Sequence, residues 1–440
     1  MHPNNATSPA ANNDSDVEDI TVDLYPFIRE YKGGRIKRFL RSPLVAASEG
    51  AAANRGVATK DVVVDEATGV SARLFLPSVA AAAGGGGERL PVIMYVHGGS
   101  FCTESAFCRT YHYYARSLAA HARALVVSVE YRLAPENPVP AAYDDAWGAL
   151  RWVTSLSDSW LSSYGDPGRT FLAGDSAGGN IVYNTAVRAS RGSGIDIEGL
   201  VIVHPYFWGV DRLSSSETTW DGVAMFTPER IDRLWPFVTA GKLGDDDPRV
   251  NPVDEEISSL ACRRVLVAVA GKDSLRDRGR QLAARMRHRR ASADAVTLLE
   301  SEGEDHVFHL HNPLRATSKI LMESIVEFVN QPTVASPLPA ALLPELHAYA
   351  CQGKEPSAGE TMNCRGQPIT LGVPTRPYVD VFGYGPRNMT RNSCLQIGQG
   401  RTPKTTKYGS FLGQVRHTTQ TNGLSPSATV AGGYVFRNFI

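Results

Sequence analysis

Short apolar runs alternate with amphipathic stretches from residue 61 to residue 329, and this alternation restricts the fold more than any other feature. The central runs are apolar without interruption, as in strands that helices cover on both faces. Predicted helices between successive predicted strands indicate an α/β fold with a mostly parallel sheet and right-handed crossovers. The expected strands are 61–66, 71–77, 91–97, 124–131, 170–175, 199–205, 264–271 and 295–301. The expected helices are 106–121, 138–157, 178–191, 228–240, 276–290 and 312–329.

Composition divides the chain into three zones. Residues 1–18 are rich in Asn, Ser, Ala and Asp and predict a disordered leader. Residues 19–330 hold all of the alternating text and predict one domain. Residues 331–440 are rich in Gly, Pro, Thr, Asn and Gln, and basic side chains outnumber acidic ones there. We expect this C-terminal extension to have low order, and a small additional domain is the alternative.

Charge and hydropathy exclude several classes of partner. Lys and Arg together number 45, as do Asp and Glu, so no global basic field points to nucleic acid or to an anionic membrane. No apolar stretch is long enough for a membrane span, and the first twenty residues contain no apolar signal segment. The six cysteines form no CxxC pair, which disfavours a zinc site and a disulfide scaffold. From these features we expect a cytoplasmic protein; they leave its oligomeric state open.

The sequence GDSAG follows a predicted strand and precedes a predicted helix, with Ser176 at its centre. A serine on such a strand-to-helix turn has an exposed hydroxyl at the carboxyl edge of the sheet. We attribute the turn to the freedom of Gly174 and Gly178. Ser176 is the candidate nucleophile.

The strand at 91–97 ends in the sequence HGGS. A tetrahedral oxyanion requires backbone N–H donors at close range, and glycine lets the backbone approach. Gly98 and Gly99 are the candidate donors, together with the N–H of Ala177 after the serine.

The remaining members of a serine mechanism are a base and a carboxylate that orients it. Asp273 directly follows the strand at 264–271 and is the candidate acid; Asp277 lies within the next helix and is the alternative. The sequence EGEDHVFHLH follows the last strand, and His306 stands in the loop before the helix. We expect His306 to be the base and His309 and His311 to be structural.

A metal site on these three histidines is disfavoured, because their spacing differs from that of H-E-x-x-H and no further ligand cluster is visible. The chemistry of a serine nucleophile requires neither a metal nor an organic cofactor. The order nucleophile, acid, base along the chain is that of the α/β-hydrolase fold.

With these residues identified, the chain resembles the plant carboxylesterases of the hormone-sensitive-lipase-like branch of the α/β-hydrolases. The resemblance covers about residues 19–330 and excludes the extension. The matching text is YVHGGSFC, VVSVEYRLAPENPVPAAYDDAWGALRWV, GDSAGGNI, HPYFWG, VAGKDSLRDRG and EGEDHVFHL. It implies an eight-stranded α/β-hydrolase domain with a small helical cap from about 20–45 and 206–245. It also implies the same nucleophile, acid, base and oxyanion donors.

The expected function is hydrolysis of small carboxylic esters through an acyl-enzyme. One alternative is a ligand-binding protein similar to the gibberellin receptor, which has an aliphatic residue at the position of the histidine. The intact His306 argues against it. A second alternative is a lyase or acyltransferase similar to 2-hydroxyisoflavanone dehydratase, acting through the same three residues.

Overall fold

The computed structural model describes residues 19–78, 89–213, 217, 226–260, 262–289 and 295–332. The chain separates into two compact units, Met1–Leu342 and Leu343–Ile440, and the described residues all belong to the first. The predicted leader and nearly all of the C-terminal extension lie outside the described residues, so their predicted low order and boundaries stay predictions.

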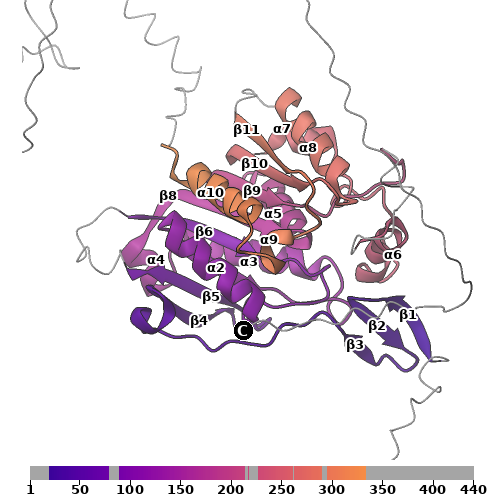
Figure 1. Ribbon diagram of the computed structural model, residues 1–440, viewed down its shortest axis with the longest axis horizontal. Coiled ribbons are helices and arrows are strands. Elements are labelled where there is room, and N and C mark those ends of the chain that lie inside the picture. The colour runs from indigo at the N-terminus through magenta and orange to yellow at the C-terminus, as the bar shows by residue number, and fades with distance from the viewer. Residues whose placement is uncertain are drawn as a thin grey trace, which may run out of the picture. The chain divides into compact units, whose positions relative to one another are not determined.

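The eight predicted strands form one sheet, in the order β11-β10-β9-β8-β6-β7-β5-β4 (Figure 1). Neighbouring strands among β6 to β11 pair in parallel. Strand β5 pairs antiparallel with both of its neighbours, β4 and β7. The bounds are β4 (Val57–Asp65), β5 (Val70–Pro77), β6 (Leu90–Val96), β7 (Leu125–Glu130), β8 (Gly165–Asp175), β9 (Ile197–Val203), β10 (Cys262–Ala270) and β11 (Val296–Ser301). The mostly parallel α/β-hydrolase sheet expected from the sequence is confirmed.

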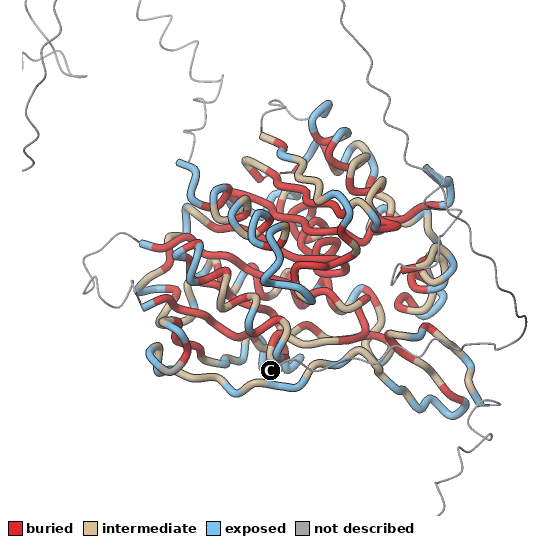
Figure 2. Tube along the Cα trace, in the orientation of Figure 1, coloured by how far each residue is buried: buried red, intermediate tan, exposed pale blue. Residues whose placement is uncertain are grey.

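Helices cover both faces of this sheet. Along β6, Val92 and Met94 belong to one hydrophobic cluster and Ile93 to another, as the two-residue period of a strand requires. Helices α3, α5 and α8 contribute to the first cluster, and α2 and α10 to the second. Figure 2 shows the resulting buried interior.

The helices are α2 (Arg109–Ala122), α3 (Ala141–Thr154), α4 (Ser159–Tyr164), α5 (Ala177–Ala189), α6 (Pro228–Val238), α7 (Asp254–Ser259), α8 (Arg276–Arg289), α9 (Phe308–His311) and α10 (Ala316–Asn330), with a 3₁₀ turn at Ala51–Asn54. None of the described helices is long and apolar enough to cross a membrane.

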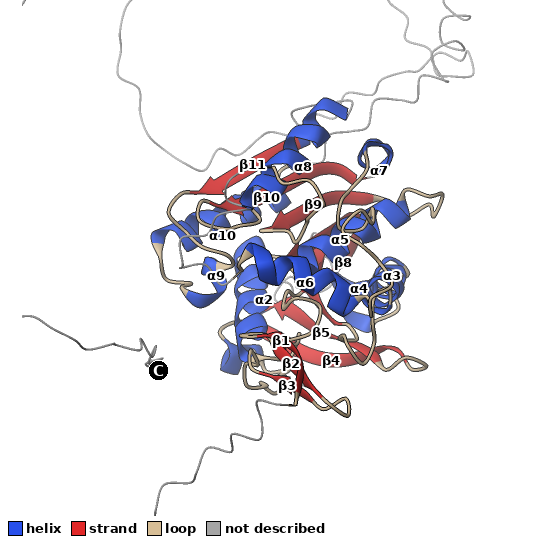
Figure 3. Cartoon of the chain, turned by 90° about the vertical axis from the view of Figure 1, so that its right-hand side faces the viewer, coloured by secondary structure: helices blue, strands red, loops and turns tan. Residues whose placement is uncertain are grey.

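The two segments expected to form a helical cap fold differently from each other. Residues 20–38 form a three-stranded antiparallel sheet, β1 (Ile20–Leu24), β2 (Ile28–Tyr31) and β3 (Ile36–Arg38), where helix was expected. Gly33 and Gly34 both have positive φ, which the tight turn between β2 and β3 requires. The second segment contains the helix α6, and residues 214–216 and 218–225 of it lie outside the described part. Figure 3 shows α6 and the small sheet in front of the large sheet.

Candidate active site

Ser176 occupies a strained turn between β8 and α5. Its φ is 53° and its ψ −121°, a conformation that a residue with a side chain rarely adopts. The flanking glycines have a different role from the expected one, since neither has positive φ. A Cβ on Gly174 would lie 2.5 Å from the oxygen of Gly178, and a Cβ on Gly178 would lie 2.0 Å from the oxygen of Val96. These glycines allow the turn to pack against β6.

The end of β9 holds this turn from the other side. The Ser176 N–H donates to the carbonyl of Val203 at 2.9 Å, and the Tyr206 N–H donates to the Ser176 carbonyl at 3.0 Å. Both backbone groups of the strained residue are therefore bonded to the neighbouring strand end. The hydroxyl is left to point into the site.

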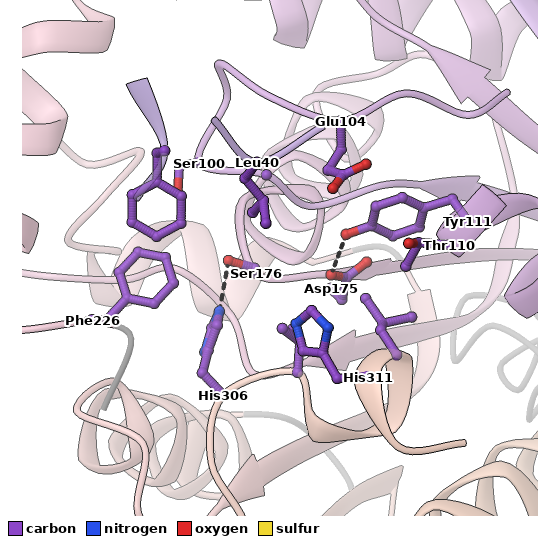
Figure 4. A pocket seen from close by; sticks show the side chains of 14 residues that line it. Leu40, Ser100, Glu104, Thr110, Tyr111, Asp175, Ser176, Phe226, His306 and His311 are labelled. Carbon is purple, nitrogen blue, oxygen red and sulfur yellow. Dashed lines mark hydrogen bonds between the residues drawn. The ribbon is translucent and has the colours of Figure 1, made fainter. Parts of the chain in front are cut away.

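Ser176, His306 and Asp273 lie in one hydrogen-bonded line. The His306 Nε2 atom is 2.9 Å from the Ser176 Oγ atom (Figure 4), and the His306 Nδ1 atom is 2.7 Å from the Asp273 Oδ2 atom. The other Asp273 oxygen accepts the N–H of Leu275 at 3.0 Å. All three side chains are buried. Asp277, the alternative acid, bonds instead to Arg276 on α8.

Asp273 and His306 shift each other's pKa values in opposite directions. Burial raises the pKa of Asp273, but the charge and hydrogen bond of His306 outweigh it, and the pKa lies below the ordinary value. Burial lowers the pKa of His306, but the charge and hydrogen bond of Asp273 outweigh it and raise the pKa above the ordinary value. The Asp273 carboxylate thus stays ionised and supports a positive imidazolium.

The prediction of Gly98 as an oxyanion donor conflicts with its hydrogen bonds. Its N–H donates to the Tyr111 hydroxyl at 2.9 Å and to the Asp175 carboxylate at 3.2 Å. That carboxylate also accepts the hydroxyls of Tyr95 at 2.5 Å and Tyr111 at 2.9 Å. Burial raises the pKa of Asp175 to about 6, against the lowering effect of these hydroxyls. The Gly98 N–H therefore belongs to a buried network behind the site.

The N–H groups of Gly99, Ser100 and Ala177 have no hydrogen-bond acceptor within the described ranges. Gly99 has φ of 105° and Ser100 of 56°, so this loop turns its N–H groups through consecutive left-handed residues. Gly99, Ser100 and Ser176 line the same pocket. Ser100 was not predicted, although its place after HGG was a visible signal.

His204, a residue that sequence reasoning left without a role, lies behind His306. Its Nδ1 atom accepts the backbone N–H of Val307 at 2.9 Å, and its ring centre is 5.8 Å from that of His306. Burial lowers the pKa of His204 to about 3, so the ring is neutral and its Nε2 atom carries the hydrogen. The HPYFWG text directly after β9 was its only sequence signal.

Among the described residues, His204, Asp273 and His306 are the one group of side chains whose ligand atoms approach closely enough for a metal ion. Asp273 and both ring nitrogens of His306 are engaged in the hydrogen bonds given above, whereas His204 is engaged through Nδ1 and its buried Nε2 atom has no partner among the described residues. His309 is also buried, beside His204 and Tyr114, and neither of its ring nitrogens has a partner in the described structure. His311 differs from the expectation, because it lines the pocket that contains Ser176.

Comparison with known proteins extends the resemblance. A model of the alpha/beta hydrolase fold family matches residues 93–310. The chain is 41% identical over 323 residues to tuliposide A-converting enzyme 1, chloroplastic, of Tulipa gesneriana, with 71% of this chain and 78% of that protein covered. It is 38% identical to probable carboxylesterase 5 of Arabidopsis thaliana, covering 71% of this chain and 98% of that one.

Two further likenesses belong to the same group. The 2-hydroxyisoflavanone dehydratase of Glycyrrhiza echinata is 38% identical, with 71% of this chain and 97% of that protein covered. Among solved structures, the hyperthermophilic esterase of Pyrobaculum calidifontis matches with a TM-score of 0.53 and 27% identity, over 62% of this chain and 82% of that one.

The expectation of a cytoplasmic protein is wrong in the light of these relatives. The tulip enzymes that match this chain are named chloroplastic or amyloplastic. The expectation rested on the lack of an apolar signal segment, and plastid transit segments are polar and Ser-rich, so this criterion does not detect them.

Proposed function

The chain belongs to the plant carboxylesterases of the α/β-hydrolase fold, and from this membership we propose that Ser176, His306 and Asp273 catalyse the hydrolysis of carboxylic esters. The observation that carries the proposal is the line of two hydrogen bonds, of 2.7 Å and 2.9 Å, from the Asp273 carboxylate through His306 to the Ser176 hydroxyl. This arrangement lets a neutral imidazole accept the proton of the hydroxyl as it attacks.

In the first step the Ser176 Oγ atom bonds to the carbonyl carbon of the ester, and its proton passes to the His306 Nε2 atom. The carbonyl oxygen becomes an oxyanion. The N–H groups of Gly99, Ser100 and Ala177 are the donors for this charge, because they line or adjoin the pocket without other acceptors in the described residues. Asp273 stabilises the imidazolium that forms.

The tetrahedral intermediate then expels the alcohol. The bond between the carbonyl carbon and the alkoxy oxygen breaks, and the proton on His306 passes to the leaving oxygen. An acyl-Ser176 ester remains. Water repeats the sequence, with His306 removing its proton and returning it to Ser176, and the carboxylic acid departs.

Two other functions use the same fold. A receptor needs no base, and the His306 ring is hydrogen-bonded on both sides within the line, which favours an enzyme. The likeness to 2-hydroxyisoflavanone dehydratase keeps elimination as the second candidate reaction. Elimination forms an alkene and releases water or another leaving group without an acyl-enzyme, so the products separate it from hydrolysis.

The test measures turnover of 4-nitrophenyl butanoate by the full chain, with mass spectrometry of the products. Ser176→Ala and His306→Ala should each lower kcat by about 10⁴-fold or more, because the members of such a line act as a unit. Ser162→Ala and His288→Ala, on exposed side chains, are the matched controls. Turnover by Ser176→Ala at the wild-type rate would overturn the proposal, and so would the absence of an acyl adduct on Ser176.

A further inference from the structure

The pocket around Ser176 has two unlike sides. Phe27 and Phe226 pack together on one side, and the polar residues Glu104, Thr110 and His311 line the pocket away from them. Figure 4 shows the Ser176 hydroxyl between Phe226 on one hand and Glu104 with Thr110 on the other. An ester attacked by this hydroxyl extends its acid and alcohol halves in different directions. The two halves therefore meet different surroundings.

The first side is aromatic. The ring centres of Phe27 and Phe226 are 4.8 Å apart, and Phe226 stands edge-on to His306 at 4.6 Å. Phe27 comes from the small N-terminal sheet region and Phe226 from the segment before α6, so both expected cap segments contribute. This side can bury an apolar or aromatic half of an ester, and its two rings provide no hydrogen-bond acceptor.

Glu104 gives the second side a carboxylate without a counter-ion. No Lys, Arg or His of the described residues forms an ion pair with it. Its neighbours are neutral: Ser42 donates through its hydroxyl at 3.3 Å and its N–H at 3.4 Å, both long bonds. Burial raises the pKa of the adjacent Cys108 thiol to about 12, and the charge of Glu104 and its hydrogen bond with the thiol act in the same direction. A carboxylate can accept about four hydrogen bonds, so Glu104 has accepting capacity beyond its contacts with Ser42 and Cys108.

His311, an exposed residue, completes this side. Desolvation lowers the pKa of its imidazole and the nearby His306 lowers it further, while Glu104 acts in the opposite direction. No hydrogen bond joins its ring nitrogens to another described residue. A neutral imidazole supplies one donor and one acceptor. A hydroxyl on this side can therefore donate to Glu104 while it accepts from His311.

We propose that the pocket selects esters that carry an aliphatic hydroxyl on one half and an apolar group on the other, with Glu104 as the acceptor of the hydroxyl. The inference rests on the proposed esterase function and adds the class of substrate. A hydroxyl-free chain on this side would remove water from the carboxylate without replacing its hydrogen bonds, which disfavours such esters.

The test compares two matched pairs of esters on the full chain. The first pair, propyl benzoate and 2-hydroxyethyl benzoate, places the hydroxyl in the alcohol. The second, phenyl butanoate and phenyl 3-hydroxybutanoate, places it in the acid. We expect the hydroxylated member to have a kcat/KM about tenfold or more higher in at least one pair, as for a hydrogen bond to a charged acceptor. The pair that responds identifies the half held by Glu104.

The variants separate recognition from structure. In Glu104→Leu the ratio within the responding pair should fall to about one, and His311→Phe should reduce it in part; a ratio between two esters is insensitive to the fraction of folded enzyme. The exposed Glu66→Leu is the matched control and should keep the wild-type ratio. Wild-type ratios of one or less in both pairs would overturn the inference, as would a ratio that survives Glu104→Leu. If 4-nitrophenyl butanoate is also left intact by the wild type, the esterase proposal itself fails.

Discussion

The imidazole of His204 accepts the backbone N–H of Val307 over 2.9 Å, and Val307 directly follows His306. Val307 has φ of 47°, a conformation that a β-branched residue seldom adopts. His204 itself stands at the end of β9, next to Val203, which binds the N–H of Ser176. One short segment thus positions Ser176, the proposed nucleophile, through its backbone and His306, the proposed base, through a side chain.

Replacing His204 tests this positioning role. His204→Phe leaves the buried Val307 N–H without an acceptor, which costs about 1–3 kcal/mol of stability and loosens the loop of the base. We expect kcat to fall by about 10–100-fold with little change in KM. His204→Asn can place an oxygen near the Nδ1 position and should recover most of the rate. Equal losses of kcat in both variants, measured by steady-state kinetics, would contradict the role.

The acid limb of the pH profile reports the protonation of His306. As the pH falls through its pKa, the ring takes up a proton and can no longer accept the one from Ser176, so kcat/KM falls. Because Asp273 raises this pKa, the midpoint should lie above the ordinary value of about 6.5. In Asp273→Asn the carboxylate is lost and burial dominates, so the midpoint of the residual activity should move below that value. An unchanged midpoint in this variant would show that another group titrates.

Tyr111→Phe tests the buried network that holds the N–H of Gly98. The change removes one donor to Asp175 and the shorter acceptor of the Gly98 N–H. We expect a loss of about 1–3 kcal/mol in the free energy of unfolding and about a tenfold fall in kcat/KM, since Gly98 leads into Gly99. Tyr113→Phe, on an exposed residue of the same helix, is the control. A Tyr111→Phe enzyme with wild-type stability would argue that the network is dispensable.

A buried ion pair links the segment before α6 to the main domain. Arg278 of α8 donates to both carboxylate oxygens of Glu217, at 2.8 Å and 2.9 Å. Arg278→Met leaves a buried unpaired carboxylate and should lower the free energy of unfolding by about 3–5 kcal/mol in urea titrations. The double variant with Glu217→Leu should regain much of it. For the exposed Arg188–Asp144 pair, Asp144→Asn should cost less than about 1 kcal/mol.

Periodicity predicted the large sheet and its principal helices because those elements bury continuous apolar runs. The small sheet β1–β3 escaped prediction, since its strands have three to five residues and are only partly buried. Its turn glycines, Gly33 and Gly34, were the visible signal.

The line of Ser176, His306 and Asp273 could be predicted because Ser176 directly follows β8, and Asp273 and His306 stand in the loops after β10 and β11, at one edge of the sheet. The occupation of the Gly98 N–H could not, because its acceptors come from Tyr111 on α2 and Asp175 on β8. The pocket position of His311 likewise depends on how α9 packs. Such contacts join segments far apart in the chain, and no local pattern specifies them.

The two different sides of the pocket bear on deacylation, the second half of the reaction. When the first product leaves, one side empties while the other still holds the acyl group on Ser176. If the emptied side is the one bordered by Glu104 and His311, we expect water to enter it and attack the acyl-enzyme. If it is the one bordered by Phe27 and Phe226, we expect an apolar alcohol to enter more readily than water. The orientation of the ester would then set the balance between release of an acid and formation of a new ester.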